Sequence, residues 1–138
     1  MPDIVISEFM DGDAVAVLAE KYDVLYDPDL VDKPDDLAAA LETAQAWIVR
    51  NRTQVRGALL SAGKHLKAVG RLGVGLDNID LDECKERGIA VLPATGANDD
   101  AVAEYVIATA MVLVRGSYLN SGAVAAGSWP RQAMIGME

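Results

Sequence analysis

The most informative part of the chain reads Val69-Gly70-Arg71-Leu72-Gly73-Val74-Gly75-Leu76-Asp77-Asn78-Ile79-Asp80. An apolar run that is typical of a short buried strand leads into a loop with glycines at 73 and 75, and a helix is expected to follow. Backbone N–H groups that point into such a loop can bind a small anion. We therefore expect the N–H groups of Val74 and Gly75 to bind a carboxylate. The alternative is a tight turn that only joins a strand to a helix.

A dinucleotide-binding loop is another interpretation of the same glycines, and the sequence argues against it. The dinucleotide fingerprint has a third glycine, where this chain has Asn78. It also has an acidic residue after the next strand, where residues 95–98 contain none. The pattern favours a small anion over a dinucleotide.

Short apolar runs alternate with helical patterns along the first two thirds of the chain. Strands are predicted at residues 4–6, 24–26, 47–49, 66–71 and 89–92, and helices at residues 11–22, 34–42, 54–61 and 80–87. Such repeats predict an α/β fold, with a parallel five-stranded sheet and helices on both faces. Ligands of open parallel sheets bind at the carboxyl ends of the strands, so Arg50, Gly73 and Thr95 are expected on one rim.

Two arginines follow the third predicted strand, in the run Arg50-Asn51-Arg52-Thr53. A guanidinium group binds carboxylate, phosphate or sulfonate groups through forked, charge-assisted hydrogen bonds. If the backbone stays extended here, the side chains of Arg50 and Arg52 point to the same side and can reach one ligand. The alternative is an ordinary solvated surface loop.

The last third of the chain has a different character. Residues 98–115 are predicted to form a long helix that is apolar almost all round, and such a helix expects protein on every side. We therefore expect a homodimer, and we interpret residues 117–138 as an arm that needs a partner. Asn98 is a favourable residue for a helix N-cap, and Val102 would on pattern alone be a core residue.

Composition excludes several classes of function. A net charge of −9 argues against nucleic acid or an anionic membrane as the main partner, because both need a basic footprint. The single cysteine, Cys84, and the lack of a signal-peptide pattern favour a cytoplasmic protein. Neither metal-ligand spacing nor a nucleophile–base arrangement is evident, and the only histidine, His65, precedes a strand and so lies at the wrong end of the sheet. We expect no metal site and no catalytic residue in this chain.

Three blocks together resemble the N-terminal domain of NAD-dependent D-isomer-specific 2-hydroxyacid dehydrogenases, the family of phosphoglycerate dehydrogenase. They are residues 48–53, residues 70–80, and Asn98 followed by Ala101-Val102-Ala103-Glu104. The resemblance implies a flavodoxin-like substrate domain and hydride transfer between C2 of the acid and a nicotinamide. It implies substrate binding by Arg50, Asn51, Arg52, Val74 and Gly75, and places Asn98 and Val102 near the cofactor.

The chain departs from the family in what it lacks. The family's catalytic arginine, glutamate and histidine and its dinucleotide fingerprint belong to a Rossmann domain that would begin where this sequence stops. We therefore expect a fragment, with a substrate domain at 1–97, an interdomain and dimer helix at 98–116, and an arm at 117–138. The fragment should bind no NAD or NADP, which belongs to the full-length enzyme, and should not oxidise any 2-hydroxy acid.

The second arginine suggests a substrate with a second anionic group, such as 3-phosphoglycerate or sulfolactate, and the sequence also resembles the sulfolactate dehydrogenases of the family. Two alternatives remain on the same scaffold: a non-catalytic flavodoxin-like binding module and a corepressor-like interaction protein. An intact glycine fingerprint followed by Arg, Glu and His beyond residue 138 would identify an enzyme.

Overall fold

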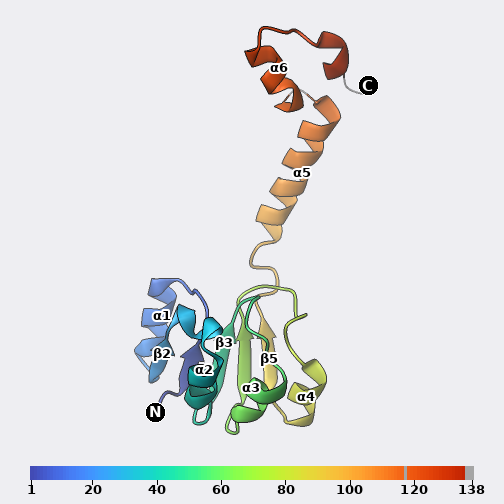
Figure 1. The fold of residues 1–138 in the computed structure, drawn as a ribbon. Coiled ribbons are helices and arrows are strands. Elements are labelled where there is room, and N and C mark those ends of the chain that lie inside the picture. The colour runs from blue at the N-terminus through green and yellow to red at the C-terminus, as the bar shows by residue number, and fades with distance from the viewer. Residues whose placement is uncertain (117, 136–138) are drawn as a thin grey trace. The chain divides into compact units, whose positions relative to one another are not determined.

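A parallel sheet of five strands, in the order β2-β1-β3-β4-β5, forms the centre of the first part of the chain. The computed structural model describes residues 1–116 and 118–135, and it divides the chain into two units, Met1–Ala97 and Asn98–Glu138. The strands are β1 (Ile4–Ile6), β2 (Val24–Tyr26), β3 (Ala46–Val49), β4 (Ala68–Arg71) and β5 (Ala90–Pro93). The prediction of a flavodoxin-like α/β fold with this sheet is confirmed (Figure 1).

Short helices connect the strands, as parallel neighbours require. They are α1 (Gly12–Ala19), α2 (Pro34–Leu41), α3 (Gly57–Ala62) and α4 (Leu81–Glu86), with a 3-10 helix η1 (Pro28–Asp32) before α2. Helix α1 is shorter than the predicted 11–22, and Asp11 caps it by accepting hydrogen bonds from the N–H groups of Asp13 and Ala14.

The predicted helix at 54–61 begins too early. Residue Val55 forms an isolated parallel bridge with Ile79 and exchanges backbone hydrogen bonds with Asn78 and Asp80 at 2.8 and 2.9 Å. This pairing keeps the chain extended before α3, because a helix cannot use the same groups. It also joins the segment after β3 to the loop after β4.

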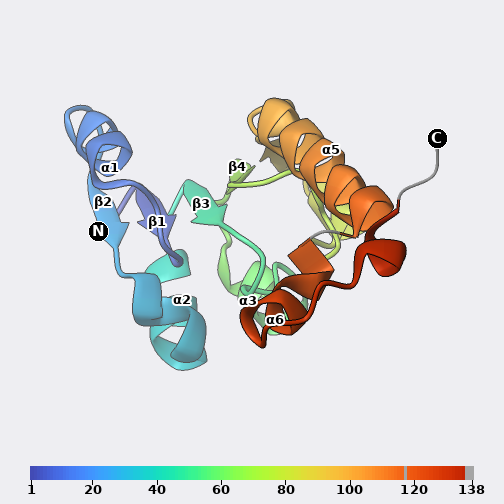
Figure 2. The same ribbon diagram turned by 90° about the horizontal axis from the view of Figure 1, so that it is seen from above.

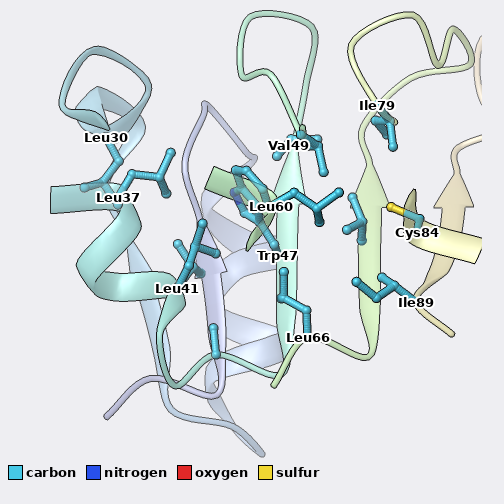
Figure 3. Packing of buried hydrophobic residues seen from close by; sticks show 14 residues of the cluster. Leu30, Leu37, Leu41, Trp47, Val49, Leu60, Leu66, Ile79, Cys84 and Ile89 are labelled. Carbon is cyan, nitrogen blue, oxygen red and sulfur yellow. The ribbon is translucent and has the colours of Figure 1, made fainter. Parts of the chain in front are cut away.

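The hydrophobic core lies on one face of the sheet, beneath α2, α3 and α4 (Figure 3). Side chains of β1, β3 and β4 that point to this face are buried, among them Val5, Trp47 and Val69. Helix α1 lies on the opposite face near β2, as seen from above in Figure 2. On that second face β4 and β5 carry Ala68, Gly70, Ala90 and Leu92, none of which is buried.

The second unit contains α5 (Asp99–Arg115), the 3-10 helix η2 (Tyr118–Asn120), α6 (Ser121–Ala125) and the 3-10 helix η3 (Arg131–Met134). Helix α5 ends at Gly116, whose φ of +64° is the left-handed conformation that favours glycine. Within the predicted arm, residues 117 and 136–138 lie outside the described residues. Across the described part of the chain, no single helix is long and apolar enough to cross a membrane.

Truncation of a leucine in the core under α2, α3 and α4 should lower the free energy of unfolding. Leu41 is fully buried, so we expect Leu41→Ala to lower the free energy of unfolding by about 2–5 kcal/mol, since it leaves a cavity. Leu92→Ala is the control, because Leu92 is 60% exposed, and we expect a change within about 0.5 kcal/mol. Urea unfolding measures both, and equal losses would contradict the placement of the core.

Candidate functional site

The strand order creates a crevice between β1 and β3. The chain passes from β1 to β2 on one side and then continues through β3, β4 and β5 on the other, and ligands of such sheets bind at this reversal, outside the carboxyl ends of the strands. Two adjoining hollows lie there. One of about 300 Å³ is lined by Phe9, Met10, Asp11, Ala14, Arg50 and Leu72. The other, of about 410 Å³, is lined by Glu8, Phe9, Pro28, Val31, Arg50, Asn51 and Arg52.

Arg50 is shared by both hollows, together with Phe9. The guanidinium carbon of Arg50 lies 5.7 Å from the centre of the Phe9 ring, a cation–π contact that holds the side chain without neutralising its charge. The arginine is otherwise exposed. It can therefore present its charge to an anion in either hollow.

A buried carboxylate organises the loop that carries the arginines. Oε1 of Glu8 accepts hydrogen bonds from the backbone N–H groups of Arg50 (2.8 Å) and Thr53 (3.0 Å), and Oε2 accepts one from the N–H of Arg52 (3.2 Å). Burial raises the pKa of Glu8, but the backbone hydrogen bonds, that from Thr53 foremost, outweigh it and lower the pKa below its usual 4.5. Glu8 is thus held as a carboxylate.

Asn78 holds the same loop through its carbonyl groups. Its Nδ2 donates to the backbone carbonyls of Arg50 at 3.0 Å and Thr53 at 2.7 Å, and the residue is buried. The loop therefore gives its N–H groups to Glu8 and its C=O groups to Asn78. Neither residue was predicted from the sequence to have this role, and Asn78 was notable there only as the position of a missing glycine.

A small buried network supports this arrangement from below. The indole N–H of Trp47 donates to the hydroxyl of Ser7 at 3.0 Å, and that hydroxyl lies 3.3 Å from the hydroxyl of Thr53. Ser7 and Thr53 are both buried. The network ties the end of β1 to the loop after β3.

The backbone around Arg52 and the ion pair of its side chain differ from what the sequence predicted. Residues 51–53 bend, so the condition of an extended backbone is not met, although Arg50 and Arg52 still line one hollow. The guanidinium of Arg52 pairs with Asp32 of η1 at 2.6 Å, with side chains 58% and 62% exposed. Exposed ion pairs contribute little to stability, so a ligand anion can compete with Asp32 at small cost.

The loop after β4 presents the two predicted N–H groups. In the described part of the chain, no protein group accepts a hydrogen bond from the backbone N–H of Val74 or Gly75, and both residues are exposed. The guanidinium of Arg71 lies directly against Gly73, where a Cβ would overlap it, and its Nε is buried with no partner among the described residues. Arg71 is a third cation at this rim, and it was not among the predicted site residues.

The residues present do not fit a dinucleotide. The position where the fingerprint has its third glycine is Asn78, which is buried and whose side chain is bonded to the loop after β3. A nicotinamide cofactor therefore cannot use this loop as its pyrophosphate site.

The remaining candidates lie elsewhere. Asn98 and Val102 belong to the second unit; Asn98 precedes α5 but makes no side-chain cap hydrogen bond, and Val102, interpreted as a core residue from its pattern, is exposed in the single chain, as all of α5 is unburied there. His65 lies near a hollow with Thr43, Gln45 and Lys67. Burial, with Asp80 and Glu83, raises the pKa of the Cys84 thiol. Over residues 1–116 and 118–135 no cluster of His, Cys, Asp and Glu could hold a metal ion.

The lowered pKa of Glu8 should appear as a pH dependence of stability. A group whose pKa is lower in the folded state stabilises the fold above its unfolded pKa, and this contribution is lost as the pH falls through the folded pKa. We expect the difference in free energy of unfolding between the wild type and Glu8→Gln to be largest at neutral pH. It should shrink as the pH falls below 4.5. Urea unfolding of both proteins across this range measures it, and a constant difference would contradict the assignment.

Comparison with known proteins gives relatives that share this architecture. (S)-Sulfolactate dehydrogenase of Chromohalobacter salexigens is 54% identical over 138 residues, which are 100% of this chain and 45% of that protein. D-3-phosphoglycerate dehydrogenase of Archaeoglobus fulgidus is 36% identical over 104 residues, 75% of this chain and 20% of that protein. The structure of D-lactate dehydrogenase from Aquifex aeolicus, with NAD and lactic acid, matches with a TM-score of 0.78 at 24% identity, over 98% of this chain and 40% of that one.

The chain thus spans less than half the length of these relatives. The family model described as "D-isomer specific 2-hydroxyacid dehydrogenase, catalytic domain" matches residues 4–125, which include both hollows and the loops after β3 and β4. On this match, the chain belongs to the D-isomer specific 2-hydroxyacid dehydrogenase family.

Proposed function

We propose that this chain is the acid-binding part of an NAD-linked dehydrogenase that interconverts a D-2-hydroxy acid and its 2-oxo acid. The observation that carries the proposal is the rim at the carboxyl ends of β3 and β4. There two backbone N–H groups without a protein acceptor lie on the loop after β4, and the loop after β3 carries Arg50 and Arg52. Family membership supplies the reaction class.

In this proposal the substrate carboxylate binds the N–H groups of Val74 and Gly75. Arg50, Asn51 and Arg52 bind the distal part of the acid, and Asn98 and Val102 lie near the nicotinamide. The chain itself contributes no catalytic residue. NAD or NADP, which accepts the hydride, and the acid/base group are provided by the rest of the protein.

A substrate with a second anionic group suits the larger hollow. Sulfolactate carries a sulfonate on the carbon next to C2, and the relative with 54% identity is a sulfolactate dehydrogenase. Its (S) descriptor is consistent with a D-series acid, because sulfur in the side chain outranks the carboxyl carbon. We propose sulfolactate as the preferred acid, with the sulfonate at Arg52.

Removal of the Arg52 side chain should weaken the binding of dianionic acids more than that of monoanionic acids. We expect Arg52→Ala to weaken binding of sulfolactate about tenfold or more, since a charge-assisted hydrogen bond contributes about 1.5–3 kcal/mol, and to leave lactate binding nearly unchanged. Isothermal titration of the chain measures both affinities. Arg115→Ala, an exposed arginine of α5, is the control. Equal losses for the two acids would refute the assignment of Arg52.

A second copy of the chain is the partner we propose for α5. Within the structure no residue of α5 is buried, and Tyr105, Ile107 and Leu113 are exposed. Burying apolar area contributes about 25 cal/mol per Å², which favours pairing of such helices.

A charged residue on the apolar surface of α5 should disrupt the proposed dimer. We expect the wild type to sediment as a dimer and Ile107→Glu as a monomer, because a carboxylate is costly in an apolar interface. Val17→Glu, at an exposed position of α1, should remain dimeric. A wild type that sediments as a monomer at high concentration would contradict the proposal.

A further inference from the structure

We propose that Glu8 is a positioning residue for the second anionic group of the substrate, acting through the backbone of Arg52. The inference rests on the proposed function and adds a specificity role to a residue that need not touch the substrate. It rests on which backbone N–H groups of the loop each carboxylate oxygen of Glu8 binds. Oε1 holds Arg50 and Thr53, whereas Oε2 holds Arg52 alone.

Glu8 binds the backbone N–H groups of the loop and the Thr53 side chain, and not the guanidinium groups. Arg50 and Arg52 both flank the hollow that Glu8 lines, yet among the described residues neither side chain forms an ion pair with it. Three N–H donors stabilise the carboxylate, as backbone amides do for anions elsewhere. The charge of Arg50 therefore stays available for an external anion, and the charge of Arg52 is shared only with the exposed Asp32, with which a ligand anion competes. Glu8 fixes the backbone from which both side chains extend.

Asn78 binds the loop on either side of Arg52 but not Arg52 itself, whose other contacts, with the Gln54 side chain and with Asp32, lie at the exposed surface. The Asn78 amide donates to the carbonyls of Arg50 and Thr53, which Glu8 also holds through their N–H groups. Residue 52 lies between them, and its backbone is anchored to the interior through the 3.2 Å bond to Glu8. The backbone position from which the Arg52 side chain extends thus depends on Oε2 of Glu8 more than the backbone of Arg50 depends on Oε1.

Substitution of Glu8 by glutamine tests the two carboxylate oxygens separately, because it keeps one oxygen and replaces the other by an NH₂ group. The single carbonyl oxygen of glutamine satisfies the two donors at the Oε1 position, while its NH₂ group then faces the N–H of Arg52, donor against donor. Glu8→Gln should therefore release Arg52 and keep Arg50 and Thr53 in place. The carboxylate of the substrate, which binds at Val74 and Gly75, should be unaffected.

The test uses the whole 138-residue chain and its backbone amide NMR signals. Wild type and Glu8→Gln are titrated with sulfolactate and, separately, with lactate. We expect Glu8→Gln to weaken sulfolactate binding about tenfold, as for the loss of one charge-assisted contact, and to change lactate binding less than about twofold. The amide proton of Arg52 should exchange faster in the variant, while those of Arg50 and Thr53 stay protected.

Glu86→Gln is the matched control, since Glu86 is exposed at the end of α4 and its substitution removes the same charge away from the hollow. It should change neither affinity. If circular dichroism shows that Glu8→Gln does not fold, Glu8→Asp is the second variant: it keeps the charge and shortens the reach of both oxygens, and it should weaken sulfolactate binding more than lactate binding.

The outcomes separate this inference from the proposed function. A wild-type chain that binds neither acid refutes the proposed function, and the inference falls with it. A wild-type chain that prefers sulfolactate, with a variant that keeps the preference or loses both acids equally, refutes only the positioning role of Glu8.

Discussion

A buried carboxylate that is bonded to backbone N–H groups holds the functional edge of this domain together. Glu8 lies at the end of β1, and its three acceptor contacts shape the loop that follows β3. Asn78, from the loop after β4, completes the arrangement through the carbonyl groups. Three adjacent strands of a parallel sheet thus end in one hydrogen-bonded unit, and the hollows of the candidate site lie against it.

The elements of the fold were largely predictable from local patterns. Strands β1 and β2 occur where the apolar runs predicted them. All of β1 is buried, and a strand covered on both faces leaves a continuous apolar run in the sequence. The start of α3 was not predictable, because Val55 pairs with Ile79, more than twenty residues away in the sequence. Helix α1 begins one residue after the predicted start, because Asp11 is its cap, and it ends at Ala19, three residues before the predicted end.

The parts of the candidate site that come just after a strand were predictable from the sequence. Arg50 and the glycine loop could be found from their positions after apolar runs, whereas Glu8 and Asn78 act through contacts with residues 25 to 45 positions away. One signal was available: an acidic residue, Glu8, comes two residues after an apolar strand at the ligand-binding end of the sheet. A buried acid there needs donors, and the nearest backbone without a strand partner is the loop after β3.

Because the loop after β3 is shaped through its main-chain groups, its path is independent of most of its own side chains. The side chains of Asn51 and Arg52 are exposed, and neither binds Glu8 or Asn78. Only the backbone N–H of Arg52 does so, at Glu8. Their side chains can be exchanged while the scaffold beneath keeps its form, as is typical of binding loops on a rigid support. Natural divergence or laboratory evolution of substrate range can therefore proceed at these two positions with little penalty to folding.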